Sequence, residues 1–307
     1  GKHNTFMGRD SGYYATTASG SVGIGLNGGQ GISTGNNNIG IGYAALGGTA
    51  TTGDNNIAIG ANAGDAITSG ANNVLMGHLA GSALTTGVSN TIIGYLAGDA
   101  LTDSNYNVAI GENALSNDVQ GLGSVAVGLG ALLLQNIGSA ADSYNTGLGY
   151  QAGYSNQTGT NNTWVGYRAG LGPGSAQNNS YNTAVGNEAL TAITTGGENA
   201  ALGASALAAL TDGTVNTALG VRAGLVLTTG DGNVFVGKDA GDSAVGVNKT
   251  VIIGFDAAQA ALTTAADGTV AVGHESLSLL TSGIGNVAIG SGSLKTNTTG
   301  DFNTAVG

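Results

Sequence analysis

A five-residue motif of polar and apolar positions recurs along the whole chain and organises it. Each copy starts with a mostly polar residue, continues with apolar or small residues and ends in glycine, as in Asn-Val-Ala-Ile-Gly at residues 286–290. There are 18 copies, and 13 of the 17 intervals between successive closing glycines are 17 residues long. A fixed short period over an entire chain is typical of a solenoid, in which each repeat is one unit stacked on its neighbours.

The apolar positions of the motif alternate with a period of two, which predicts a short β-strand in every copy. The residue before the closing glycine is aliphatic in all 18 copies, and the residue two positions earlier is mainly Val, Ile or Thr. These two positions share one face of a strand, so we expect that face to form the core. The residue between them varies widely in size, which indicates a face against solvent or a neighbouring chain. It is usually Ala or Gly but also Phe6, Leu75, Ile92, Trp164, Phe235 or Ile252.

The remainder of each repeat predicts a turn and a second straight segment. The third residue after the closing glycine is Ala in 13 of 17 copies, and the fourth is Gly or Leu in all but one, Ala258. A Thr- and Gly-rich turn such as Thr-Thr-Gly at residues 228–230 follows. We therefore expect one coil with two short straight segments per repeat, and Ala-rich faces flat enough for chains to associate side by side. The asparagines that begin 14 copies would stack into a ladder.

Composition narrows the possible classes of protein. The net charge is −11, and no Lys or Arg occurs between Arg9 and Arg168, which argues against a nucleic-acid partner. Hydrophobic residues make up 41% of the chain, which does not fit a charge-rich disordered segment. The absence of cysteine excludes disulfides and thiolate metal sites. No apolar run approaches the roughly 20 residues of a membrane span, and we expect residues 1–307 to be a single repeat domain within a longer fibrous protein.

The repeat resembles a known family. The unit Asn-Thr-Ala-Val-Gly-x-x-Ala-Leu at residues 182–190, together with the Thr-Thr-Gly turn, is similar to the head repeats of YadA-like trimeric autotransporter adhesins. It also resembles repeats of bacteriophage tail fibres. The resemblance implies a left-handed parallel β-roll, a homotrimer, and a rod that binds host or matrix surfaces. The adhesin heads usually repeat every 14 residues, so the resemblance does not predict the width of the roll in this chain.

Aromatic residues are the first candidates for surface contact. All ten tyrosines precede residue 182, and Tyr150 and Tyr167 occupy equivalent positions in successive copies, which predicts that they stack. Exposed aromatic rings bind sugar faces or protein partners, although such rings more often serve packing. The candidate contact residues are Tyr144, Tyr150, Trp164, Tyr167 and Tyr181.

Enlarged repeats are the second place where we expect a contact. Extra residues fall around 133–143 and 170–180, with smaller additions near Thr49 and residues 260–267. Insertions in solenoids emerge as loops on one face, which is often the binding face, although loops also tolerate neutral insertion. We therefore expect specific contacts in the middle third of the chain.

Three motifs with possible chemistry fit better with structural roles. The glycines at 23, 25 and 28 satisfy the dinucleotide pattern GxGxxG, but the sequence predicts no helix after them. His78 and His274 are 196 positions apart, which disfavours a shared metal or catalytic site. Turn aspartates at 54, 231, 267 and 301 lack the GGxGxD repeat of calcium-binding solenoids. We expect no catalytic residue, cofactor or metal, and hence no enzyme.

The sequence thus predicts an all-β parallel β-roll that serves as the structural and adhesive shaft of a tail fibre or bacterial surface adhesin. Its expected partners are further copies of itself and a cell-surface glycan or protein receptor, outside the cell. Two alternatives stay open at this point. One is a self-assembling extracellular filament, and the other is a β-solenoid that binds ice or another crystal surface through rows of threonine.

Overall fold

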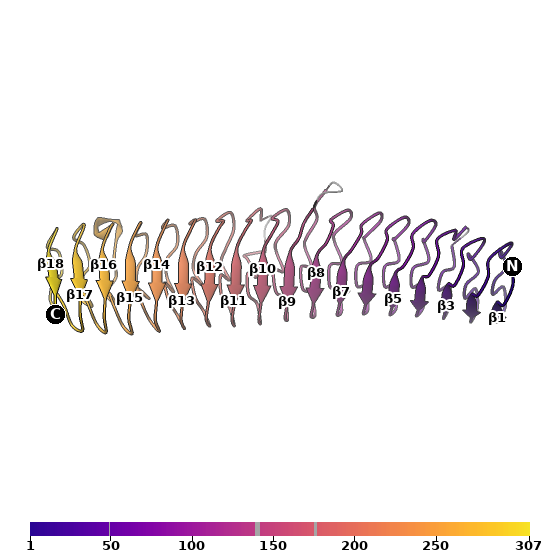
Figure 1. Cartoon of the computed structure of the whole chain (residues 1–307), viewed down its shortest axis with the longest axis horizontal. Helices are drawn as coiled ribbons and strands as arrows, with labels where there is room; N and C mark the ends of the chain where they lie inside the picture. The colour runs from indigo at the N-terminus through magenta and orange to yellow at the C-terminus, as the bar shows by residue number, and fades with distance from the viewer. Residues whose placement is uncertain (49, 139–141, 175–176) are drawn as a thin grey trace. The chain divides into compact units, whose positions relative to one another are not determined.

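A computed structural model describes residues 1–48, 50–138, 142–174 and 177–307. The chain divides into two compact units, Gly1–Thr158 and Gly159–Gly307. Each unit is built from coils that contain one three-residue strand (Figure 1).

The strands coincide with the predicted motif copies. In the first unit they are β1 (Thr5–Met7), β2 (Val22–Ile24), β3 (Ile39–Ile41), β4 (Ile57–Ile59), β5 (Val74–Met76), β6 (Thr91–Ile93), β7 (Val108–Ile110), β8 (Val125–Val127) and β9 (Thr146–Leu148). In the second unit they are β10 (Thr163–Val165), β11 (Thr183–Val185), β12 (Ala200–Leu202), β13 (Thr217–Leu219), β14 (Val234–Val236), β15 (Val251–Ile253), β16 (Val270–Val272), β17 (Val287–Ile289) and β18 (Thr304–Val306). A short 3-10 helix, η1 (Thr264–Ala266), precedes β16.

Within each unit, each strand pairs in parallel with the strand of the next coil, in register with the repeat. In the second unit, for example, Thr217 pairs with Val234 and Leu219 with Val236. The predicted parallel β-solenoid with a 17-residue repeat is therefore confirmed. The predicted second straight segment is wrong, because the rest of each described coil is mostly turns. Only isolated bridges form there, such as Ile32 with Thr51 in the first unit.

The prediction of which strand face is buried was also wrong. In every strand except the terminal strands β1 and β18, the middle residue points into the coil and is buried, as at Leu75 and Phe235. The two flanking positions, which we expected to form the core, lie on the outer surface. Leu202 is 49% exposed and Ile289 is 41% exposed. Period-two alternation shows which residues share a face, but both faces of these strands are apolar, so alternation does not show which one is inside.

Side chains of complementary size fill the interior of each coil. A large middle residue is matched by a small residue at the fourth position after the closing glycine. Such pairs are Phe6 with Gly12, Leu75 with Gly81, Ile92 with Gly98, Trp164 with Gly170, Phe235 with Gly241 and Ile252 with Ala258. Several coils with a small middle residue carry leucine there instead, as in Ala201 with Leu207. The alanines at the third position are buried too, so the expected Ala-rich association face is part of the core.

The predicted asparagine ladder is confirmed within each unit. The Asn216 side chain is fully buried, and its Nδ2 donates to Asn199 Oδ1 at 3.1 Å and to the Gly230 carbonyl at 2.7 Å. Its Oδ1 accepts hydrogen bonds from the backbone and side-chain nitrogens of Asn233. Because every polar atom of the amide has a partner, the burial of a polar row inside the coil carries no desolvation penalty from unpaired groups.

The coil depends on left-handed backbone at several positions, and the closing glycine is the most restrictive. Its φ lies between +116° and +142° in all copies, and at Gly220 an added Cβ would lie 2.5 Å from the Gly237 carbonyl oxygen. The residue before the first residue of each motif (called here the pre-asparagine position, because that first residue is asparagine in most copies) is also left-handed, with φ between 46° and 70°. Unlike the closing glycine, it accepts Asn, Gly, Tyr and Lys.

Candidate functional site

Four of the five predicted contact residues lie on the surface, and one does not. Tyr144, Tyr150, Tyr167 and Tyr181 are exposed, whereas Trp164 is fully buried in β10. The sequence predicts a surface position for Trp164 because the middle strand position tolerates many residue types. That variety instead reflects compensation by Gly170, which leaves room for the indole. Tyr150 belongs to the first unit and Tyr167 to the second, so their stacking stays a prediction.

Tyr144 and Tyr181 share the pre-asparagine position, with φ of 46° and 61°. A left-handed conformation is unfavourable for a bulky side chain, so these exposed tyrosines occupy backbone that Asn or Gly would fill at lower cost. The Tyr144 ring covers Gly123, within 3 Å of where a Cβ would stand. The nearby Asp142 carboxylate, which accepts a hydrogen bond from the Tyr144 hydroxyl, raises the pKa of that phenol. Tyr144 is therefore held on the surface by contacts on its ring and its hydroxyl.

The enlarged repeats are only partly described by the structure. The insertions around 133–143 and 170–180 include residues 139–141 and 175–176, and the addition near Thr49 includes that residue, all outside the described part of the chain. The addition at 260–267 is described throughout. It contains η1 and ends at Asp267, on the border of a groove in the second unit.

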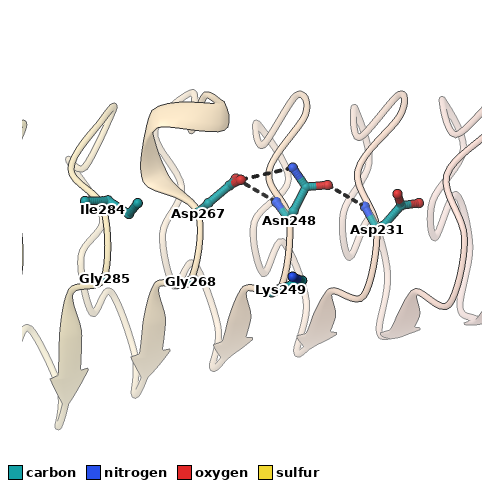
Figure 2. Close-up of a pocket in the computed structure, with 7 residues that line it drawn as sticks. All are labelled: Asp231, Asn248, Lys249, Asp267, Gly268, Ile284 and Gly285. Carbon is teal, nitrogen blue, oxygen red and sulfur yellow. Dashed lines mark hydrogen bonds between the residues drawn. The ribbon is translucent and has the colours of Figure 1, made fainter.

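This groove has a volume of about 590 Å³ and crosses four successive coils, which contribute β14 to β17. Its lining residues are Asp231, Asn248, Lys249, Asp267, Gly268, Ile284 and Gly285. Figure 2 shows that Asp231, Asn248 and Asp267 form a row from coil to coil, with the η1 turn beside Asp267. Lys249, Gly268 and Gly285 occupy the adjoining pre-asparagine position.

Hydrogen bonds between coils fix the polar wall of the groove. Asp267 accepts from the Asn248 backbone nitrogen at 2.8 Å and from Asn248 Nδ2 at 3.1 Å. Asn248 Oδ1 accepts in turn from the Asp231 backbone nitrogen at 3.0 Å, as Figure 2 shows. Asp231 Oδ1 accepts from the backbone nitrogen and hydroxyl of Thr214. The turn aspartates that invited a calcium interpretation thus cap backbone N–H groups of the preceding coil.

The remaining sequence motifs are distributed along the coils. Gly23 is the middle residue of β2, Gly25 is a closing glycine, and residues 26–31 are turns. His78 stacks on Tyr95 in the first unit with ring centres 5.5 Å apart. His274 stacks on Phe255 in the second unit at 5.6 Å. Among the described residues, no group of three or more His, Asp or Glu side chains is arranged to hold a metal ion.

A buried polar cluster in the first unit has a role in stability rather than an open site. The Asp118 carboxylate is fully buried and accepts hydrogen bonds from Gln135 Nε2 at 2.5 Å, the Gly121 nitrogen at 3.1 Å and the Ile137 nitrogen at 3.3 Å. Gln135 Oε1 accepts from Asn145 Nδ2 at 2.9 Å. Burial outweighs these hydrogen bonds and raises the pKa of Asp118 above its usual value.

Asp118 is expected to make the first unit less stable as the pH rises. Because its folded pKa lies above its unfolded value of about 3.9, the folded state binds more protons between these two values, and stability falls with rising pH there. Asp118→Asn removes this titration. Urea midpoints at a series of pH values from 3 upwards should fall less steeply for the variant than for the parent. Parallel pH profiles would contradict the assignment, and comparing the two proteins cancels the contribution of the other carboxylates.

No protein-family model, curated protein or solved structure matches the chain. In the part of the chain that the structure describes, no helix has the length and apolar character needed to cross a membrane. The interpretation of function therefore depends on the surfaces of the two units.

Proposed function

We propose that the chain is a structural and adhesive shaft segment of a tail fibre or bacterial surface adhesin, located outside the cell and assembled as a homotrimer. The observation that supports it best is the outer strand face in each unit. The first and third strand residues point outward and are never charged, although the net charge of the chain is −11. The third strand residue is apolar in every copy, and contiguous exposed apolar patches mark interaction sites.

A further copy of the same chain is the occupant that fits this face best. Successive coils are separated by one strand spacing, about 4.8 Å. Only a partner with the same spacing keeps its side-chain rows in register with these rows over many coils. Because the face carries no charge, copies can meet there without repulsion between like charges. Between Thr183 and Leu219, small residues such as Ala200 open an apolar groove of about 300 Å³ on this face.

The adhesive part of the proposal is supported by exposed aromatic and polar groups away from the strand face. The tyrosines at the pre-asparagine position and the groove of Figure 2 present chemistry that the coil itself does not require. In an oligomer each of these surfaces would occur once per chain. Several weak contacts on a common scaffold would then combine into strong attachment to a glycan or protein on another surface.

The two alternatives receive less support. Rows of exposed threonine are the basis of an ice-binding interpretation, but their hydroxyls donate to carbonyls of the next coil, as Thr211 does to Thr228 at 3.0 Å. Valine interrupts the row at Val245. A filament subunit would use the same outer faces without forming a closed oligomer, so the size of the assembly separates this alternative from the trimer.

The solution mass of the purified segment tests the proposal. Light scattering should give the mass of three chains, and the double variant Leu202→Lys and Leu219→Lys should give the mass of one, because a buried unpaired ammonium group strongly opposes association. The control double variant Thr195→Lys and Thr229→Lys adds the same two charges at exposed polar positions and should leave the mass unchanged. A one-chain mass for the parent would rule out the homotrimer, and a mass that grows with concentration would favour the filament.

A further inference from the structure

The floor of the groove in Figure 2 is made of glycine in two consecutive coils, Gly268 and Gly285. Nowhere else in the sequence does the pre-asparagine position hold glycine in two successive repeats. At Gly268 an added Cβ would meet no atom within 4 Å, so neither local packing nor crowding by neighbours demands glycine there. Its φ of 70° is left-handed, and asparagine adopts left-handed backbone at the same position in other coils, as at Asn55 with φ of 61° and Asn161 with φ of 59°. Gly268 therefore leaves open space that the fold does not require, whereas Gly285 makes room for the Phe302 ring, which lies 2.9 Å from where a Cβ would stand.

The walls of this groove carry both acceptors and donors. Each oxygen of the Asp267 carboxylate accepts one hydrogen bond. Because a carboxylate has about four acceptor sites, Asp267 can accept further hydrogen bonds from a ligand. The described contacts of Asp231 use Oδ1 and leave Oδ2 available. Lys249 is exposed and belongs to no ion pair among the described residues, and its aliphatic stem passes Gly232. Ile284, 44% exposed, adds an apolar surface.

We propose that this groove binds a short neutral oligosaccharide, an inference that rests on the adhesive role proposed above. A sugar hydroxyl both donates and accepts, so one ligand can satisfy the carboxylates of Asp231 and Asp267 as well as the ammonium group of Lys249. The C–H face of a pyranose ring packs against Ile284. The carboxylates and the net charge of −11 disfavour an anionic ligand.

The dimensions of the groove agree with this class of ligand. Four coils span three strand spacings, roughly 14 Å, which is about the length of a trisaccharide. The volume lies within the roughly 300 to 1,000 Å³ of small-molecule sites. The hydrogen-bonded row from Asp231 to Asp267 holds the polar wall in place before a ligand arrives, which reduces the entropic cost of binding.

Saturation-transfer NMR on the whole segment tests the assignment with four probes. These are maltotriose, cellotriose, triacetylchitotriose and, as an anionic comparison, 3′-sialyllactose. At least one neutral trisaccharide should bind with a Kd in about the millimolar range. Gly268→Asn should raise that Kd at least about tenfold, because its side chain occupies the groove while the left-handed backbone is retained. Lys249→Met should weaken binding in the same direction.

Matched controls distinguish loss of the groove from general damage. Gly292→Asn places the same side chain at a left-handed position with equally open space, outside the groove, and should bind normally. Lys295→Met removes a lysine that is paired with Glu275 and should also be neutral. The assignment is overturned by the absence of signal from all three neutral probes, by binding of sialyllactose alone, or by normal binding to Gly268→Asn.

The same samples separate this inference from the proposed function. Gly268→Asn lies away from the strand face and should keep the mass of the parent in light scattering. Loss of sugar binding in a protein that remains trimeric supports the groove assignment specifically. If the parent forms the trimer but binds no neutral sugar, the groove assignment is wrong and the shaft proposal stands. If the parent is a monomer that binds sugar, the trimer is wrong and the groove assignment stands.

Discussion

Gly220→Ala is expected to prevent stable folding of the second unit. The closing glycine has φ of +140° there, and a Cβ would lie 2.5 Å from the Gly237 carbonyl oxygen and 2.6 Å from its carbonyl carbon. Both neighbours are backbone of the next coil, so relief of the clash would break the parallel pairing of β13 with β14. Backbone strain and overpacking together should cost at least about 4 kcal/mol.

Gly246→Ala is the control for this experiment. Gly246 does not have positive φ, and an added Cβ would contact Thr264 at an ordinary 3.5 Å. Urea unfolding followed by far-ultraviolet circular dichroism should show a change of less than about 1 kcal/mol for this variant. If Gly220→Ala unfolds at the same urea midpoint as the parent, the close stacking of closing glycines is not a requirement of the fold, contrary to what the structure indicates.

The period of the sequence predicts the architecture because the architecture repeats with it. All 18 strands in the described part of the chain lie at the expected motifs, and the asparagine ladder forms where identical residues recur at a fixed interval. A parallel solenoid places equivalent residues next to each other, so the spacing of the motif directly gives the register.

Alternation alone does not predict which strand face points into the coil, but a second pattern in the sequence does. On a solvent-exposed face, the size of one residue does not depend on the sizes of the other residues in its coil. Here the large middle residues Trp164 and Phe235 are each followed six positions later by glycine, whereas Ala201 is followed by Leu207. Such compensation indicates packing in a shared interior, where total volume is conserved.

The groove and the exposed pre-asparagine residues have a weaker sequence signal. Residues of very different character share the left-handed conformation at this position, including Tyr144, Val215 and Lys249. No propensity of these residues predicts positive φ. The insertion at 260–267 did mark one border of the groove, but its floor depends on two glycines that look like any others in a chain with 58.

A reciprocal exchange in the core of the second unit tests the compensation directly. Trp164→Ala should destabilise the unit by about 4 kcal/mol, because it leaves a cavity the size of an indole in a coil that cannot collapse between its paired neighbours. Gly170→Leu alone should cost a similar amount, since an added Cβ already lies 2.3 Å from the Trp164 ring. Leucine itself is compatible with the backbone at this position, because Leu190 and Leu207 have the same left-handed conformation at the equivalent place in neighbouring coils.

The double variant Trp164→Ala with Gly170→Leu recreates the pair found in the coil of Ala201 and Leu207. We expect it to be more stable than either single variant, with a coupling energy of at least about 3 kcal/mol in a double-mutant cycle of urea unfolding. An exposed Trp164 would behave differently: its replacement would cost less than about 0.5 kcal/mol, and the two changes would be additive. The sign and size of the coupling therefore decide between an inward and an outward middle strand residue, on which the assignment of the outer apolar face as the association surface depends.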